Sequence, residues 1–465
     1  MTSVDVTILE QHIDLLKPLL PARDAPEAAA YMLLGSSEIA SDPWTGEPRL
    51  RLVTHRVVDI PVADRISASP VHVTWSTASF MRLLGDALTT GKVPALVHTH
   101  PGSHAFFSEQ DDRNESELAR TAHHKGVKGL VSIVLGGDGS VCARIWLDAK
   151  AYVLADAVQI VGGRYARHGR VPVEGASASH LDRQRRLFGE GFNATLRSLR
   201  VCVIGCGGTG SAVALLLARL GVGRIYLIDN DTLAESNLNR VHGSHRADVG
   251  APKVEILKRE IEAMGVECHV IASRSWVKSP EVRDALRAAD FLFGCTDDNS
   301  GRIFINRVAY FYGIPVVDVG LRMVAPTETH SADLNGRVTT VLPGRPCLVC
   351  SGVVNAVRAN EEDLARTRPE EFQRRKDEAY VIGGGDPAPA VVTFTTEMAT
   401  VAVDEMIAAL TGFHGMEGMI PNRVRRWHAR DDRFIAHTRR DGCPICNSET
   451  SCGAGDVVPF LDMVS

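Results

Sequence analysis

The sequence has little excess charge and no long apolar run, and both absences narrow what the protein can be. Its 465 residues carry a formal net charge of −5, which argues against a nucleic-acid-binding protein and gives no polybasic signal for a membrane surface. No apolar stretch reaches about 18 residues, and Met1–Lys17 lacks the charged-then-apolar order of a secretion signal. We therefore expect a cytoplasmic protein with neither nucleic acid nor membrane among its partners.

The composition that is present is typical of a soluble globular protein. Hydrophobic residues make up 45% and charged residues 23% of the chain, and its length suffices for two or three domains with full cores. Composition and motifs predict a first domain over residues 1–150 and a linker over 151–180, rich in glycine, serine and scattered charge, with a short structured start at Ala151–Gln159. A second domain over 181–450 and a flexible tail over 451–465 are predicted to follow.

A strand–turn–helix–strand pattern over Val201–Arg240 organises the second domain. An apolar strand ends in the glycine turn Gly205-Cys206-Gly207-Gly208-Thr209-Gly210. A helix and a second strand, which ends at Asp229, follow. Such a turn lets the backbone approach phosphate oxygens, and an aspartate at the second strand's tip can hydrogen-bond ribose hydroxyls. By itself the pattern fits NAD enzymes as well as ATP users.

Charged and polar residues that follow this unit favour ATP. They are, in order, Asp231, Asn237, Arg240, Lys253 and Asp297. A nicotinamide reaction develops no phosphate charge, whereas cleavage of ATP does. Two cations and a magnesium ion held by Asp297 would stabilise that charge. We therefore expect ATP and Mg²⁺ as cofactors.

This ordered set resembles the ThiF/MoeB-like enzymes of the ubiquitin-activating superfamily, over roughly Leu181 to Asn447. The resemblance implies adenylation of a protein's C-terminal carboxylate, usually a diglycine end. It implies ribose binding by Asp229, with Asp231 beside it, and a magnesium ion on Asp297. It also implies phosphate contacts from Asn237, Arg240 and Lys253, and an arginine lent across a homodimer, which Arg183 matches.

The elements after the glycine turn alternate between apolar strands and helices of 10–15 residues. This alternation predicts an α/β domain with a doubly wound, largely parallel, Rossmann-like sheet. Ligands bind beyond the carboxyl ends of such strands, where Gly205, Asp229 and Asp297 all fall.

His98 and His100 end a predicted strand in the first domain, and Ser108 and Asp111 open the helix that follows. Residues i and i+2 of a strand point to one face, so both imidazoles can reach one metal ion, and the aspartate adds an oxygen. Three ligands leave a fourth tetrahedral position for water, as in catalytic zinc sites. Zinc lowers the pKa of that water, and a nearby carboxylate takes its proton.

The spacing of these four residues resembles that of the JAMM/MPN metalloisopeptidases, and the match covers about Pro26–Leu147. These enzymes cut after the C-termini of ubiquitin-like proteins, so the resemblance implies an N-terminal α/β domain of that family. Their general base is a glutamate shortly before the first strand, for which Glu27 is the candidate. Ser108 would hold the oxygen of the tetrahedral intermediate.

Four of the ten cysteines form two paired knuckles, Cys347-Leu348-Val349-Cys350 and Cys443-Pro444-Ile445-Cys446. Four thiolates make a closed tetrahedral zinc site without an open position, and disulfides are not expected in a cytosolic chain. We predict a structural zinc ion that fastens the C-terminus onto the second domain.

The polar segment between the knuckles, about Asn355–Pro387, contains no cysteine. Many activating enzymes move the adenylated carboxylate onto a cysteine in this crossover loop, and Val381 lies near the position where sulfur-carrier enzymes place theirs. Either the adenylate passes directly to an outside nucleophile, or another thiol serves. Cys452, in the predicted flexible tail, is the candidate for that thiol.

Together these motifs predict a bifunctional enzyme that acts on a ubiquitin-like or sulfur-carrier protein ending in two glycines. One half adenylates that terminus with ATP, and the other cuts at it with zinc, for precursor processing or deconjugation. A conjugating enzyme or a sulfur donor is a further partner that the resemblance implies. The alternatives are an enzyme that adenylates a peptide in a modified-peptide pathway, a non-catalytic scaffold and an NAD oxidoreductase.

Overall fold

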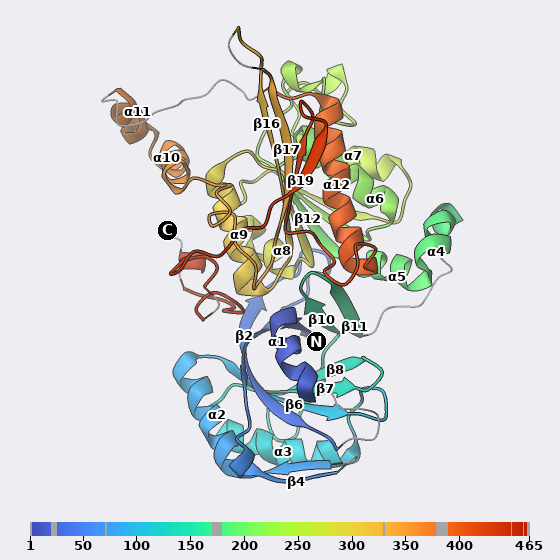
Figure 1. The fold of residues 1–465 in the computed structure, drawn as a ribbon, viewed down its shortest axis with the longest axis vertical. Helices are drawn as coiled ribbons and strands as arrows, with labels where there is room; N and C mark the ends of the chain where they lie inside the picture. Colours follow the sequence, from blue (N-terminus) through green and yellow to red (C-terminus); the bar gives the residue numbers. More distant parts are fainter. Residues whose placement is uncertain are drawn as a thin grey trace. The chain divides into compact units, whose positions relative to one another are not determined.

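The computed structural model describes residues 2–19, 26–69, 72–169, 179–328, 331–377, 389–447, 449–458 and 460–462 (Figure 1). Its contacts divide the chain into two compact units. Unit 1 comprises Met1–Pro172, Tyr310–Gly313 and Asn447–Ser465, and unit 2 comprises Val173–Ala309 and Ile314–Cys446. None of the described helices has the length and apolar character needed to span a membrane.

Unit 1 is built on a nine-stranded mixed sheet in the order β11-β10-β1-β3-β2-β6-β7-β8-β9. Its strands are β1 (Ser3–Leu9), β2 (Ala29–Ile39), β3 (Arg49–Val58), β6 (Val93–His100), β7 (Leu130–Gly136), β8 (Val141–Trp146), β9 (Tyr152–Leu154), β10 (Ala157–Val161) and β11 (Tyr165–Gly169). A separate hairpin pairs β4 (Arg65–Ser69) with β5 (His72–Trp75). The order matters for function because β6, which carries the two histidines, lies near the middle of the sheet.

Helices α2 (Thr77–Thr90) and α3 (Glu109–His124) cover one face of this sheet, and α1 (Glu10–Leu16) packs on the other. The alternation of side chains along β2 explains the two faces. Tyr31 packs in the core formed with α2 and α3, whereas its neighbour Met32 packs in the core that includes α1. The helix predicted to open at Ser108 matches α3, which begins one residue later.

Residues 151–169 belong to unit 1, which corrects the linker expected over 151–180. Strand β10 pairs in parallel with β1, so that Val158 lies opposite Val6 and both are buried. Strand β9 pairs with β8 at the opposite edge of the sheet. The partner strand β1 lies about 150 residues earlier in the chain, and local sequence carries no sign of that pairing. Residues 170–178 lie outside the described part of the chain.

Unit 2 is built on an eight-stranded sheet in the order β14-β13-β12-β15-β16-β17-β18-β19. Its strands are β12 (Arg200–Ile204), β13 (Arg224–Ile228), β14 (His269–Ser273), β15 (Phe291–Gly294), β16 (Val316–Val324), β17 (Asp333–Val341), β18 (Asn422–Arg426) and β19 (Asp431–Phe434). The first five strands of this order are parallel, and the last three add antiparallel pairs. The predicted doubly wound α/β fold is confirmed. Its strand order reverses between β12 and β15, the kind of position where such sheets bind ligands.

Helices cover both sides of the unit 2 sheet, with α6 and α12 on one side and α9 on the other (Figure 1). The helices of this unit are α4 (Asp182–Phe188), α5 (Glu190–Ser198), α6 (Gly208–Leu220), α7 (Lys253–Ala263), α8 (Arg283–Ala288), α9 (Asn299–Tyr312), α10 (Ala356–Thr367), α11 (Pro369–Asp377) and α12 (Val392–Thr411), the end of α9 being counted with unit 1. The expected crossover loop therefore begins with two helices. Val381 lies outside the described residues.

The C-terminal segment packs within unit 1, which corrects the expectation of a flexible tail. Ser451–Gly455 are all buried. The ammonium group of Lys92 donates a hydrogen bond to the carbonyl oxygen of Ala454 at 2.6 Å. A Cβ on Gly35 of β2 would lie 2.2 Å from a carbonyl oxygen of the segment, so only glycine permits this approach. Cys452 is thus held in a buried segment and not on a mobile one.

Candidate functional site

The turn after β12 requires glycine at two positions. Gly205 has a φ of +86°, and a Cβ there would lie 2.8 Å from backbone atoms of Cys295. A Cβ on Gly210 would lie 1.8 Å from the carbonyl oxygen of Gly205. Gly207, the N-cap of α6, has open space where its Cβ would be. A phosphate group can therefore approach the backbone at the N-terminus of α6.

Asp229, just after β13, holds this turn in place. Its carboxylate accepts hydrogen bonds from the backbone N–H groups of Cys206 at 2.6 Å and Asp231 at 2.8 Å. Burial raises the pKa of Asp229, and the charge of Lys253 and the two N–H groups oppose the rise. The carboxylate thus lies beside the glycine turn, where a ribose would be within reach.

Two cations lie at the same edge of the sheet. The side chain of Arg240 packs over the turn, since a Cβ on Gly208 would lie 3.1 Å from its Cγ. The guanidinium donates to the carbonyl oxygen of Ser236 at 2.6 Å. Lys253 is buried, and its Nζ lies 2.7 Å from a carboxylate oxygen of Asp231. The structure therefore brings together the glycine turn and both predicted cations.

Three further predicted residues have different surroundings. The side-chain oxygen of Asn237 accepts a hydrogen bond from the N–H of Ala234 at 3.2 Å, so this residue caps a short 3₁₀ turn. Asp297 is exposed and follows β15 at the edge where the glycine turn lies. Arg183 is exposed on α4, and no hydrogen bond or ion pair joins it to the turn within the described residues.

The second centre lies in unit 1, where His98 and His100 of β6 meet Asp111 of α3. The Nε2 atoms lie 3.3 Å (His98) and 3.9 Å (His100) from oxygens of the aspartate. One ligand atom from each residue lies within 4.8 Å of the others. The Nε2 of His98 is buried and makes no hydrogen bond within the described residues. Two imidazoles and one carboxylate with an unsatisfied buried nitrogen fit a zinc ion.

Ser108 fixes Asp111 through the N-terminus of α3. The N–H of Ser108 donates to the Asp111 carboxylate at 2.7 Å, and its Oγ accepts from the N–H of Asp111 at 3.2 Å. Burial disfavours ionisation of Asp111, but the contact with His98 and the bonds from Ser108 outweigh it and hold the pKa of that carboxyl well below its usual range. Asp111 is therefore ionised at neutral pH, the form that binds a metal.

Ser108 also has a side-chain hydrogen bond to the same carboxylate. Its Oγ donates to Asp111 at 2.7 Å. A role for this hydroxyl in holding a reacting oxygen would require it to rotate away from Asp111.

A cavity of about 380 Å³ opens onto the His98, His100 and Asp111 cluster. Glu27, which precedes β2, also lines it, with a carboxylate oxygen 3.8 Å from the Nε2 of His100. Burial raises the pKa of Glu27 to about 7, although the nearby His98 opposes the rise. A carboxyl group that titrates near neutrality is suited to accept and release a proton.

The cavity wall also includes residues that the sequence did not single out, namely Trp75, Leu96, Phe106 and Leu118. The ring of Phe106 stands edge-on to His100, with the ring centroids 4.9 Å apart. Phe106 could have been predicted to line the cavity, because it lies in the loop between His100 and Ser108, which must pass close to the cluster.

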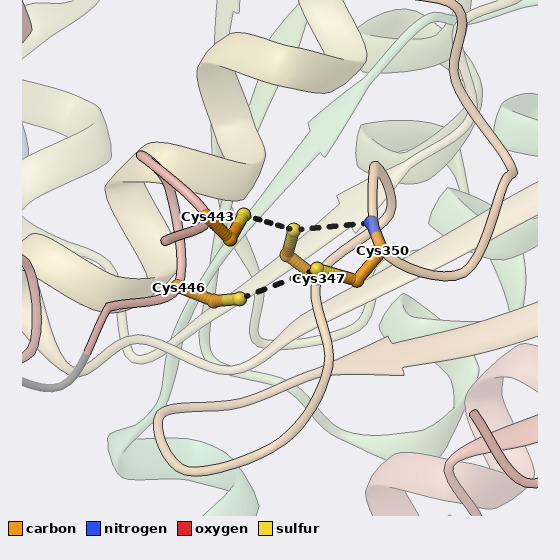
Figure 2. Close-up of side chains that lie close together, drawn as sticks. All are labelled: Cys347, Cys350, Cys443 and Cys446. Atoms are coloured by element: carbon orange, nitrogen blue, oxygen red, sulfur yellow. Dashed lines mark hydrogen bonds between the residues drawn. The ribbon is translucent and has the colours of Figure 1, made fainter. Parts of the chain in front are cut away.

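The third centre, in unit 2, is the cluster of four cysteines (Figure 2). The two knuckles face each other, with sulfur atoms 3.7 Å apart for Cys347 and Cys443 and 3.6 Å apart for Cys350 and Cys446. Four thiolates around zinc at about 2.3 Å would be about 3.8 Å apart. Burial disfavours ionisation of Cys443, but backbone N–H groups of its knuckle outweigh it and lower the pKa of this thiol to about 7. All four side chains are buried, so the donor set fits a closed zinc site.

The other cysteines are not presented as nucleophiles. None of the ten cysteines is exposed. Burial raises the pKa of Cys142 to about 11 and that of Cys268 to about 12, and it also raises the pKa of Cys206 and Cys295. Because the thiolate is the reactive form, these groups are poor acceptors for an acyl group.

The fold and these centres define a two-domain chain. One unit carries a glycine turn of the kind that binds nucleotides, and the other carries a cluster of three potential metal ligands beside a cavity. The family model named ThiF matches residues 181–445, more than half of the chain, and the chain belongs to the ThiF family. Residues 10–148 match the model for prokaryotic homologs of the JAB domain. The protein is thus a JAB–ThiF fusion, which confirms the two families predicted from the sequence.

Curated relatives match part of the chain. The SAMP-activating enzyme E1 of Haloferax volcanii is 30% identical over 180 residues, which are 37% of this chain and 62% of that protein. The adenylyltransferase and sulfurtransferase UBA4 of Yarrowia lipolytica is 34% identical over 155 residues, which are 33% of this chain and 35% of that protein. The chain thus covers less than two thirds of these relatives.

Solved structures include a similar chain of low identity. The crystal structure of E. coli MccB with MccA-N7isoASN aligns with a TM-score of 0.46 and 19% identity, over 59% of this chain and 75% of that one.

Proposed function

We propose that the ThiF half adenylates the C-terminal carboxylate of a small ubiquitin-like or sulfur-carrier protein that ends in two glycines. The observation that carries this proposal is the meeting of the glycine turn, Asp229 and two cations, Arg240 and Lys253, at one edge of the unit 2 sheet. Relatives named as a SAMP-activating enzyme and as an adenylyltransferase and sulfurtransferase support this substrate class.

In the proposed reaction, a carboxylate oxygen of the partner attacks the α-phosphorus of ATP and diphosphate leaves. Negative charge builds on the phosphate groups, which Arg240 and Lys253 would stabilise. Lys253 pairs with Asp231 at 2.7 Å. A bound phosphate group would replace that carboxylate as the partner of the ammonium group. The exposed Asp297 is our candidate for Mg²⁺, and Arg183 is our candidate for a contact with the nucleotide of a second copy in a homodimer.

The acyl adenylate would then pass to a nucleophile outside this chain. Every cysteine of the chain lies in the described residues and none is exposed. Cys452, the one thiol considered for a thioester, is buried. An amine or thiol of another molecule would therefore attack the adenylated carbonyl carbon and release AMP.

The JAB half is proposed to cleave the amide bond beyond the same C-terminus. A zinc ion held by His98, His100 and Asp111 would supply a Lewis acid. Glu27 would accept the proton of the attacking water, and its pKa of about 7 suits that task. The cavity of about 380 Å³ leaves room for an extended peptide end beside these groups.

An exchange assay tests the adenylation half. The full chain, ATP and a candidate partner ending in two glycines should exchange labelled diphosphate into ATP. Asp297→Ala should abolish the exchange, whereas Glu262→Ala, at an exposed position of α7, should leave it intact. Partners whose tail lacks the terminal glycine should not support the exchange. Exchange that persists in Asp297→Ala would contradict the role given to this residue.

A second candidate is adenylation of a short peptide. The absence of an exposed cysteine favours it, because an adenylate that is used directly needs no thioester. Synthetic peptides compared with folded partners in the same exchange assay would distinguish the two. Faster exchange with an isolated peptide than with any folded partner would favour this candidate.

A further inference from the structure

Arg144 of β8 is a fully buried cation beside the helix that carries Asp111. Its side chain is 1% exposed. Its guanidinium carbon lies 3.9 Å from the ring centroid of Phe107, 4.8 Å from that of Trp146 and 4.6 Å from that of Tyr152. Burying a guanidinium is costly unless charged partners satisfy it. Its partners therefore indicate what it does.

Those partners are two carboxylates of α3 close to Asp111. The Nη1 of Arg144 lies 2.5 Å from a carboxylate oxygen of Asp112, and its Nε donates to Glu115 at 2.8 Å. The indole N–H of Trp146 donates to the same Glu115 oxygen, also at 2.8 Å. Glu115 is almost fully buried, and both its hydrogen-bond donors come from β8.

The positions of Asp111 and Glu115 on α3 make this arrangement significant. Residues four apart lie one above the other on a helix face. Glu115 accordingly lines the same cavity as Asp111 and the two histidines. A second carboxylate, capable of binding zinc, thus lies one turn from the predicted ligand.

The register of the sheet shows why Arg144 can reach Glu115. Arg144 lies opposite Ser132 of β7, and Ser132 lies opposite Leu96 of β6. Leu96 is two residues before His98, so the three positions share a face with the histidines. Helix α3 crosses this face, with Asp111 against β6 and Glu115 against β8.

We propose that Arg144 is a positioning residue that keeps Glu115 out of the metal cluster, so that a cation meets only His98, His100 and Asp111. An unpaired Glu115 would offer an additional oxygen ligand from the same helix face. It would fill the position that a catalytic zinc site leaves open. This inference rests on the metal site proposed for the JAB half.

Cobalt absorption on the full chain tests the proposal. With zinc already in the cysteine cluster, added Co²⁺ should report on the His98, His100 and Asp111 cluster, because its visible absorption weakens as the coordination number rises. Arg144→Met should change the cobalt spectrum towards higher coordination. Glu115→Gln should leave the spectrum unchanged, because the amide oxygen can still accept from Trp146. The double variant should recover the parent spectrum.

The control is Arg120→Met, which removes an exposed arginine of α3 that pairs with Glu117. It should leave the cobalt spectrum unchanged. Arg144→Lys retains one positive charge but cannot bridge both carboxylates, and it should give an intermediate spectrum if Arg144→Met fails to fold.

The outcomes separate this inference from the proposed function. If the parent chain binds no second metal equivalent, or His98→Ala leaves that binding intact, the proposed metal site fails. If the parent binds and the double variant keeps the altered spectrum of Arg144→Met, Glu115 is not the additional ligand and the inference is overturned. An altered spectrum in Glu115→Gln alone would also overturn it.

Discussion

The two candidate metal centres of this chain differ in their donor atoms and in their surroundings, which are the properties that distinguish catalytic from structural metal sites. The cysteine cluster has four buried sulfur donors, with sulfur atoms 3.7 Å and 3.6 Å apart across the two knuckles. The cluster of His98, His100 and Asp111 has three donors, a neighbouring carboxyl group and a cavity of about 380 Å³. The number of donors and the cavity, rather than the presence of metal ligands, indicate which centre can act on a substrate.

The two centres are also built differently from the sequence. Each cysteine knuckle is a tight local turn, so its geometry is set within four residues, and only the pairing of the knuckles is long-range. The open cluster joins a strand to the start of the next helix. The relative positions of its three side chains depend on the cap that Ser108 provides and on the packing of α3. A closed centre should therefore matter most for folding, and an open one for turnover.

The largest effect on stability is expected from removing a ligand of the cysteine cluster. A structural zinc site contributes on the order of 10 kcal/mol, comparable with the whole stability of a domain. Cys443→Ser should therefore reduce the zinc content by one equivalent and unfold part of unit 2, as measured by metal analysis, thermal melting and proteolysis. Cys268→Ser, which changes a cysteine outside the cluster, should retain the metal and the melting temperature. A folded Cys443→Ser protein without zinc would show that the cluster is not structural.

The open centre should respond in the opposite way. His98→Ala should remove cleavage of a partner with an extended C-terminus, down to the uncatalysed rate, because one of three metal ligands is lost. The melting temperature should change far less than in Cys443→Ser, and diphosphate exchange should persist. A His98→Ala chain that still cleaves at the parent rate would remove the distinction between the two centres.

Glu27 should affect the rate without affecting metal binding. Its carboxylate lines the cavity and lies beside His100, but it is not one of the three residues of the cluster. Glu27→Gln should lower the cleavage rate by about 10²–10⁴-fold, the usual contribution of a general base, with unchanged zinc content. Glu109→Gln, on the exposed side of the first turn of α3, serves as the control. Loss of zinc from Glu27→Gln would instead make Glu27 a ligand.

Much of this fold, the glycine turn and the cluster of His98, His100 and Asp111 could be predicted from the sequence, because their signals are local. Val201–Ile204, the glycine turn and Asp229 follow one another in a single unit, and the structure forms that unit as expected. The spacing of His98, His100 and Asp111 is likewise short, and the strand period and the helix cap bring them together.

What could not be predicted depends on contacts between distant residues. The pairing of β10 with β1 places residues 157–161 in the first sheet, although the sequence predicts a linker there with only a short structured start. The packing of Ser451–Gly455 depends on the glycine at position 35, more than 400 residues earlier. The role proposed for Arg144 was also missed, because an isolated arginine in a strand gives no sign of the carboxylates that it meets.

The smallest expected effect concerns Glu405, a buried carboxyl group that belongs to neither of the two metal clusters described above. Asp111 has a lowered pKa because it has a histidine and a capping serine as partners. Burial raises the pKa of Glu405 on α12 from 4.5 to about 7, and the N–H of Ile420 opposes the rise only in part. Because the folded pKa exceeds the unfolded one, the folded state binds the extra proton, so this contribution to stability is full below pH 4.5 and is lost as the pH rises through about 7. A shift of this size corresponds to about 3 kcal/mol.

Glu405→Gln should remove this dependence, which urea unfolding of the parent and the variant at pH 5 and at pH 8 would measure. The variant's gain in unfolding free energy over the parent should be larger at the higher pH by up to about 3 kcal/mol. Taking the difference between two chains with the same cysteine cluster cancels the opposite trend of zinc binding, which strengthens as thiols lose protons. Glu262→Gln, at an exposed position, should show no such difference. An equal effect of Glu405→Gln at both pH values would mean that the partners of Glu405 stabilise its charge as those of Asp111 do, and it would contradict the contrast between the two carboxyl groups.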